Sequence, residues 1–274
     1  MNGILELAFD ATGAAGATRL AKLFQAAPLR ALFPETCGMD LPVAALTATC
    51  GGFTGGDRMK IGISVGPDAQ AMAVAQAAEK LYRAGSGETR IEIALEAAAG
   101  GWLEWLPQET ILFNGARLRR DNRIDIHADA AVLAGEILVF GRSASGETLD
   151  HGLVHDAWSV RRDGRLIWSD RCHAEDDVLR TALSHAAGLD GAKAAAMLVH
   201  AGPDAAGHLE LARSLANAAP SDLRCGATLV NGVLVMRWLA PEAHLLRSSF
   251  AAAWVAMRAA ARSLSPRLPS FWLH

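Results

Sequence analysis

A two-residue alternation of apolar with small or polar side chains constrains this chain most strongly, and it runs from about Met59 to Gly146. Ile61, Ile63 and Val65 lie two residues apart, and the residues between them are glycine or serine. The same period recurs in Arg90–Glu96. Because successive side chains of a strand point to opposite faces, this pattern predicts half-buried β-strands separated by turns.

Further short segments carry the strand pattern on both sides of this region. They are Ile124 and Ile126 with their polar neighbours, Gly135–Phe140, Asp156–Val160 and Leu166–Trp168. Thr228–Trp238 reads as a hairpin around Asn231-Gly232, because both turn residues tolerate positive φ. The sequence therefore predicts a protein that is mainly β.

Helix signals gather late, in Asp176–Ala187, Pro203–Ala218 and, most clearly, Pro241–Leu264. In the last segment the apolar residues follow three- and four-residue spacing, and Pro241 suits the first turn. Three arginines are expected elsewhere on its surface: Arg247, Arg258 and Arg262. Pro266 and Pro269 follow the segment and stop the helix.

Composition excludes several classes of protein. The 274 residues are 51% apolar and 20% charged, which supports one large buried core, so a single domain over 1–274 is expected. A net charge of −3 with scattered basic residues argues against nucleic-acid binding. The first residues do not have the pattern of a signal peptide, so export is not expected, and no apolar run is long enough to span a membrane. Four separated cysteines fit reduced thiols, so a soluble cytoplasmic protein is expected.

The segment Cys50–Asp57 is the densest glycine cluster. It lacks the Lys-Ser/Thr ending of a phosphate-binding loop, and Asp57 precedes a strand rather than a helix. The simplest interpretation is a tight turn with glycines at positive φ. The functional alternative is that the turn presents the Asp57 carboxylate to a polar passage or an interface.

Two tryptophans and two carboxylates stand close together in Trp102–Glu109. Paired tryptophans favour packing, but Glu104 and Glu109 could form the acid–base pair of a hydrolase. His151 and His155 have the spacing of a helical metal pair, which Gly152 weakens. Residues 172–177 combine Cys, His and three acids, and an acidic helix start explains them better than a metal site.

Taken in order, several blocks resemble the signatures of one family. The run 51–58, GGFTGGDR, is similar to a "GG-x-x-GGD" block, and 76–83, QAAEKLYR, to a "Q-x-x-x-K-x-Y" block that includes Lys80 and Tyr82. Residues 103–113, LEWLPQETILF, are the most specific match, followed by a Gly-Glu pair at 135–136 and a "GR-x-x-GE" block at 141–147. The ending RLPSFW at 267–272 resembles "R-x-P-R-x-W", with Ser270 in the second basic position. These blocks resemble the UreD/UreH family of urease accessory proteins.

The resemblance implies an elongated, β-helix-like stack of strands with a few α-helices in the C-terminal half, the helical portion covering about 203–274. It implies no catalysis and no tightly bound cofactor. The expected partners are UreF, the UreG GTPase through UreF, and apo-urease, in a complex that could dimerise. The Arg267–Trp272 tail is a candidate partner surface, unless it packs on its own domain.

The resemblance also implies that nickel passes through a polar tunnel on its way to urease. Carboxylates suit such transit because they bind nickel weakly enough to release it. The candidate ligands are Asp57 first, Glu136 second, and then Glu104 and Glu109. A metal-storing or metal-sensing protein is a further alternative, and it would need a dense His/Cys site that the sequence does not show.

Overall fold

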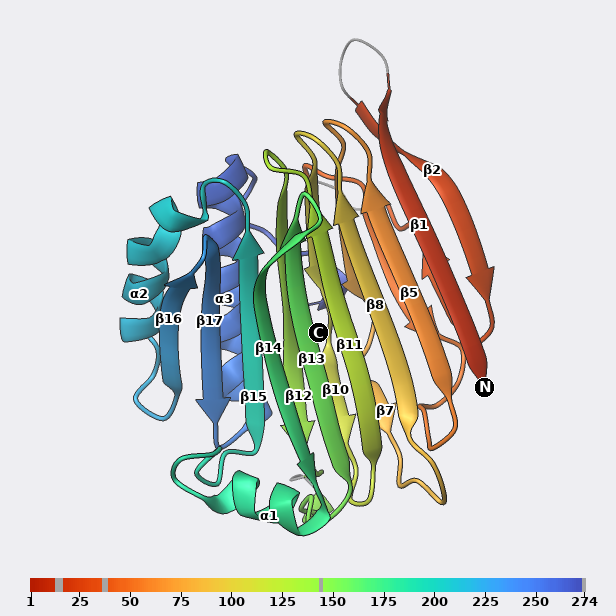
Figure 1. Ribbon diagram of the computed structural model, residues 1–274, viewed down its shortest axis with the longest axis vertical. Coiled ribbons are helices and arrows are strands. Elements are labelled where there is room, and N and C mark those ends of the chain that lie inside the picture. The colour runs from red at the N-terminus through yellow and green to blue at the C-terminus, as the bar shows by residue number, and fades with distance from the viewer. Residues whose placement is uncertain (13–16, 36–38, 143–144, 273–274) are drawn as a thin grey trace.

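The computed structural model describes residues 1–12, 17–35, 39–142 and 145–272. Within them, two twisted sheets stack face to face, and helices cover the outer face of the second sheet (Figure 1). We refer to the two sheets as sheet A and sheet B.

Sheet A has seven strands among the described residues. Their spatial order is β14 (Arg165–Glu175), β13 (Leu153–Arg162), β11 (Arg117–Ile126), β8 (Thr89–Ala97), β5 (Arg58–Val65), β1 (Asn2–Thr12) and β2 (Ala17–Ala26). The five strands from β1 to β13 run parallel, and each end of the sheet is closed by an antiparallel strand.

Sheet B has ten strands in the same part of the chain. Its main path is β16 (Arg224–Val230), β17 (Val233–Ala240), β15 (Ala194–Ala201), β12 (Ala131–Phe140), β9 (Trp102–Leu106), β6 (Gln70–Ala75), β4 (Val43–Ala48) and β3 (Leu29–Leu32). Off this path, β10 (Glu109–Leu112) pairs with β12 and with β7 (Glu79–Leu81).

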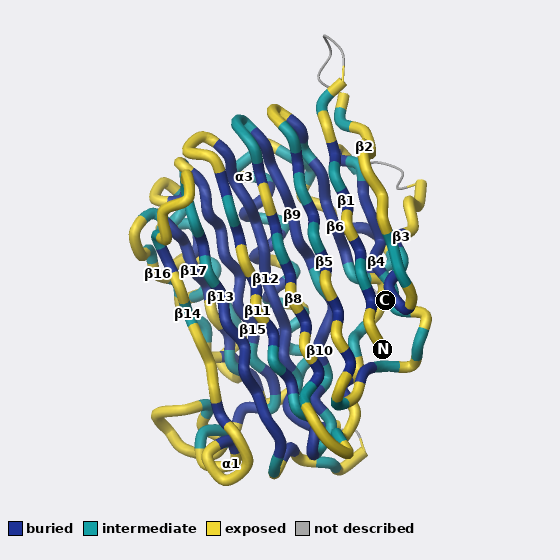
Figure 2. The backbone as a smooth tube through the Cα atoms, turned by 45° about the vertical axis from the view of Figure 1, so that its right-hand side comes forward, coloured by how far each residue is buried: buried dark blue, intermediate teal, exposed yellow. Residues whose placement is uncertain are grey.

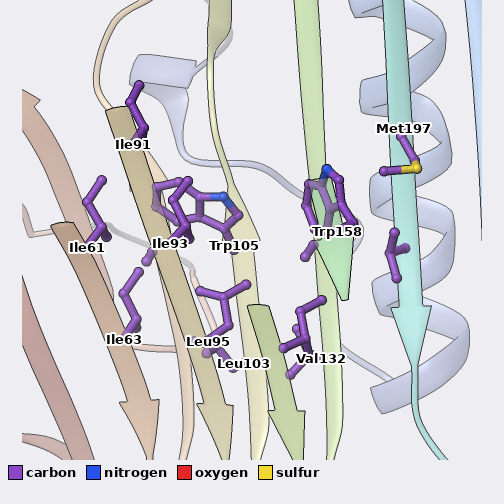
Figure 3. Packing of buried hydrophobic residues seen from close by; sticks show 14 of the residues in the cluster. Ile61, Ile63, Ile91, Ile93, Leu95, Leu103, Trp105, Val132, Trp158 and Met197 are labelled. Carbon is purple, nitrogen blue, oxygen red and sulfur yellow. The ribbon is translucent and has the colours of Figure 1, made fainter. Parts of the chain in front are cut away.

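The chain alternates between the sheets as it advances, so β5, β6, β8, β9, β11, β12 and β13 build successive parallel coils. This arrangement is the predicted β-helix-like stack. Figure 2 shows the resulting alternation of buried and exposed residues along the strands of sheet A. The inward side chains meet between the sheets, including Ile61, Ile93, Leu103 and Trp105 (Figure 3).

A second core lies between sheet B and the C-terminal helices, α2 (Leu209–Asn217) and α3 (Ala243–Arg262). It is rich in aromatic rings: Phe250 lies 5.6 Å from Trp238, 5.6 Å from Trp254 and 6.4 Å from Trp272, centroid to centroid. Gly135 of β12 makes this approach possible, since a Cβ there would lie 2.7 Å from Phe250 Cζ.

The remaining helices also follow the sequence pattern. α1 (Asp176–Ser184) begins at the expected acidic residues, and the 3₁₀ helix η2 (Ala205–His208) precedes α2. A second 3₁₀ helix, η3 (Ser270–Trp272), lies near the end of the chain. None of the described helices combines the length and apolar character needed to cross a membrane.

Two details of α3 differ from the expectation. The helix begins at Ala243, so Pro241 precedes it instead of occupying its first turn, and it ends where Ser263 adopts a left-handed φ of 53°. Placing all three arginines on the surface was wrong for Arg258, which is completely buried. Its guanidinium has a buried carboxylate partner on sheet B, which compensates its charge.

Candidate functional site

Charged side chains lie inside the stack, on strand positions that otherwise carry apolar residues. Arg120 and Asn122 have the inward parity of Leu118 and Ile124 on β11, and Asp156 is their neighbour on β13. Glu136 reaches the same space from β12 of sheet B. Parallel pairing aligns Arg120 with Asp156, so the register of sheet A itself brings the opposite charges together.

The contacts within this interior cluster are specific. Arg120 Nε donates to Asp156 Oδ2 at 2.8 Å, and Nη2 donates to both Asp156 and Glu136. Arg120 Nη1 donates to Thr110 Oγ1 at 3.2 Å, and Asn122 Nδ2 donates to Asp156 Oδ1 at 2.9 Å. The guanidinium is therefore fully engaged and fixes the two carboxylates.

Carboxyl groups outnumber guanidinium groups in this cluster, because Glu79 also acts on Arg120. Burial raises the pKa of Glu136 well above its usual range; the Asp156 charge adds to the rise and Arg120 opposes it. Burial also raises the pKa of Glu79 to about 7, again against Arg120. Glu79 and Glu136 therefore hold protons near neutral pH, and a cation could replace those protons.

Two cavities meet at this cluster. The first, of about 290 Å³, lies between the sheets and is lined by the glycine loop, Glu79, Arg120 and Glu136. The second, of about 510 Å³, is lined by Glu136 together with Asp170, Cys172 and Cys225. Glu136 lines both, so the cluster stands at the junction between them.

The two cysteines of the second cavity are free thiols. Burial raises the pKa of the Cys225 thiol to about 11, and burial with nearby carboxylates raises that of Cys172. Because the thiolate is the form that binds metals, these protonated thiols are weak ligands near neutral pH.

Asp57 immediately precedes β5 and is almost fully buried. Its carboxylate accepts from the Thr54 amide at 2.9 Å and from the Met1 amino group. Gly52 of the same loop has a φ of 148°, and a Cβ there would lie 2.5 Å from the Lys80 carbonyl oxygen. The Tyr82 hydroxyl donates to the Gly51 carbonyl at 2.7 Å. The expected turn is present, and Asp57 braces it.

Glu104 points from β9 toward α3, on the face of sheet B opposite Glu136. Its carboxylate accepts from Trp102 Nε1 at 3.0 Å, Trp254 Nε1 at 2.9 Å and Arg258 Nε at 3.1 Å, with no exposed surface. A carboxylate so enclosed has no room for substrate or water, which does not support the hydrolase alternative.

Glu109 also braces the helix layer. Arg247 Nη1 donates to Glu109 at 2.7 Å, and Arg247 Nη2 donates to the Trp272 carbonyl. Trp272 is buried, and its Nε1 donates to the Pro107 carbonyl at 3.0 Å. The C-terminal tail therefore packs on its own domain through Trp272, which was the alternative to a partner surface.

The four candidate carboxylates consequently occupy three separate places: the loop before β5, the junction of the cavities, and the α3 interface. Sequence reasoning missed Glu79, Arg120 and Asp156, which accompany Glu136. The sequence feature that could have revealed the cluster is a polar residue at a strand position where the alternation predicts an apolar one. His155 lies on β13, so its spacing from His151 is not helical, and its Nδ1 lies 3.1 Å from that of His173.

Comparison with known proteins identifies the family of the chain. The family model described as "UreD urease accessory protein" matches residues 1–273. A urease accessory protein UreD of Magnetococcus marinus is 41% identical over 261 residues, covering 94% of this chain and 89% of its own. A UreD of a Methylobacterium species is 42% identical over 237 residues, covering 85% and 83%. The resemblance inferred from the sequence blocks is confirmed: the chain belongs to the UreD family of urease accessory proteins, which are not enzymes.

Proposed function

We propose that this protein assists urease maturation by holding apo-urease together with UreF and UreG, and by passing Ni²⁺ through its interior toward the urease active site. Family membership supports the maturation role. The observation that carries the passage is Glu136, a buried carboxylate that lines both cavities within a cluster richer in carboxylates than in guanidinium.

The chemistry of the cluster suits transit. Ni²⁺ accepts carboxylate oxygens, and it can displace the protons that burial holds on Glu79 and Glu136. Arg120 keeps a positive charge beside any bound cation, which weakens its binding and favours release. Two cavities on either side give the ion a place before and after this step.

The test is nickel incorporation into urease in cells that co-express the urease subunits, UreF, UreG and either this protein or a variant. Glu136→Gln and Asp156→Asn keep the side-chain volume and remove a carboxyl group. Each is expected to lower nickel per urease by about tenfold, the scale seen when a group that organises a metal site is removed. Nickel is measured by elemental analysis of purified urease, and activity by urea hydrolysis.

Glu92→Gln is the matched control, because Glu92 lies on β8 of the same stack but is exposed on the outer face, 3.4 Å from Lys60. It should load nickel as the wild type does. Co-purification of each variant with UreF shows whether the complex still assembles, and so distinguishes a defect in nickel passage from a defect in assembly. Wild-type nickel content in urease matured with both interior variants would refute the passage.

A further inference from the structure

A group of three potential metal ligands lies away from the interior cluster. His200 is the penultimate residue of β15, Asp204 lies in the turn that follows, and His208 ends η2. His200 has the parity of Leu198, so it points to the helix-covered face of sheet B, whereas Glu136 points to sheet A. Among the described residues, this is the group of three whose ligand atoms all lie within 4.8 Å of one another.

The distances match those of ligands that share one ion. His200 Nε2 lies 3.1 Å from Asp204 Oδ1, and His208 Nε2 lies 3.0 Å from Asp204 Oδ2. An ion bound tetrahedrally at about 2.0–2.1 Å holds its ligand atoms roughly 3.3 Å apart. Only small movements would therefore bring these three side chains onto one metal.

The alternative is a structural clasp, in which both histidines hydrogen-bond to Asp204 and no metal binds. This alternative leaves one feature unexplained. His200 is completely buried, and its Nδ1 has no hydrogen-bond partner among the described residues. An unpaired buried polar nitrogen is costly. A metal would bind Nε2 and leave Nδ1 unpaired, but the free energy of coordination would offset this cost, which hydrogen bonds to Asp204 alone do less well.

The surroundings leave access for an ion. His200 forms the closed floor of the site, while the His208 side chain is 17% exposed and that of Asp204 is 38% exposed. Arg162 Nη2 donates to the Gly202 carbonyl at 3.4 Å and holds the intervening turn.

We propose that His200, Asp204 and His208 bind one divalent first-row transition-metal cation, with open positions for water. Two imidazoles and one carboxylate suit Ni²⁺ or Zn²⁺ and disfavour Mg²⁺, which prefers oxygen ligands. Three ligands leave the coordination shell incomplete, so water can fill the open positions. The site is independent of the proposed interior passage, from which it is separated by sheet B.

Equilibrium dialysis of the purified full-length chain against Ni²⁺, and separately Zn²⁺, tests the site. Asp204→Asn and His208→Gln should each lose one equivalent of bound metal, while Mg²⁺ in excess should not displace Ni²⁺ from the wild type. His244→Gln is the matched control: His244 also contacts a carboxylate, Glu242 at 3.1 Å, but it is 72% exposed and lacks a third ligand. It should retain the full stoichiometry.

X-ray absorption of the Ni²⁺-loaded wild type provides a readout that does not depend on how the variants fold. Scattering from two imidazoles is expected in the wild type, and this signal should be absent in His208→Gln, which no longer holds the ion. Unchanged stoichiometry in both site variants, or a spectrum without imidazole scattering, would overturn the proposal. A lower melting temperature in Asp204→Asn with unchanged metal content would identify the group as a hydrogen-bonded clasp.

Discussion

Glu104 and Glu136 lie on opposite faces of sheet B, and each meets an arginine inside the protein, yet their surroundings differ. Glu104 faces Arg258 with one charge of each sign, and two indole N–H groups complete its hydrogen bonds. Glu136 shares Arg120 with Asp156 and adjoins two cavities. A balanced, densely packed ion pair such as Glu104–Arg258 stabilises the fold, whereas surplus carboxyl groups beside open space form a site that can exchange protons for a cation.

The largest expected effect on stability comes from the buried pair Glu104–Arg258. Glu104→Gln or Arg258→Met leaves a buried partner uncompensated and should lower the free energy of unfolding by about 3–5 kcal/mol. The double variant should recover part of this loss, because it removes both charges. Urea denaturation of the four proteins measures the coupling.

The exposed pair Lys60–Glu92 is the control, and its removal should cost about 0–1 kcal/mol. If the Glu104 and Arg258 variants cost no more than this control, the two clusters do not differ as described.

A smaller effect is expected at Gly135. This residue faces α3, whereas its neighbour Glu136 on β12 faces sheet A. In Gly135→Ala the new Cβ would lie 2.7 Å from Phe250 Cζ and 2.8 Å from the Met197 carbonyl oxygen. This overpacking should cost about 1–3 kcal/mol in unfolding free energy. Nickel delivery by the folded variant should be unchanged, since Glu136 points to the other face. Nickel delivery that falls as far as in Glu136→Gln would show that the two faces are coupled.

Gly226→Ala is the matched control for this substitution. Gly226 is also a strand glycine, on β16, and a Cβ there would meet nothing within 4 Å. Its melting temperature should stay at or slightly above that of the wild type.

The smallest expected effect is the pH dependence of stability that Glu79 causes. The pKa of Glu79 rises from 4.5 to about 7 on folding, so the folded chain holds a proton that the unfolded chain releases. Stability from this group is complete below pH 4.5 and is lost as pH rises through about 7. The melting temperature should therefore fall across this window by about 2–4 °C for each kcal/mol lost.

Glu79→Gln should flatten this dependence, whereas Glu92→Gln should keep it. Calorimetry at a series of pH values compares the three proteins. An equal slope in Glu79→Gln would mean that Glu79 does not take up a proton on folding.

The strands and the family were predictable from the sequence because alternation is a local pattern. The interior cluster could not be predicted from local alternation alone, because the register that aligns Arg120 with Asp156 joins residues 36 apart in the chain. A local signal did exist: Arg120 and Asn122 occupy the parity of Leu118 and Ile124. Polar residues on an apolar parity mark buried polar groups wherever a strand is certain.

Arg258 and the histidine group show why other features were missed. Arg258 lies four residues after Trp254, on the buried stripe of α3, but its partner Glu104 is 154 residues away, so its charge suggested the surface. His200, Asp204 and His208 span the end of a strand, a turn and a 3₁₀ helix. No single period relates these three residues, and only the fold of the turn brings them together.

The late position of α3 has a consequence for synthesis of the protein. Trp254 closes over Glu104 of β9 from 150 residues further along the chain. At about 5–20 residues per second, the ribosome needs roughly 8–30 seconds to make that interval. Throughout this time the aromatic and aliphatic outer face of sheet B is uncovered on the nascent chain. Yield in the cell should therefore depend on holding chaperones that shield this face until its last helix emerges.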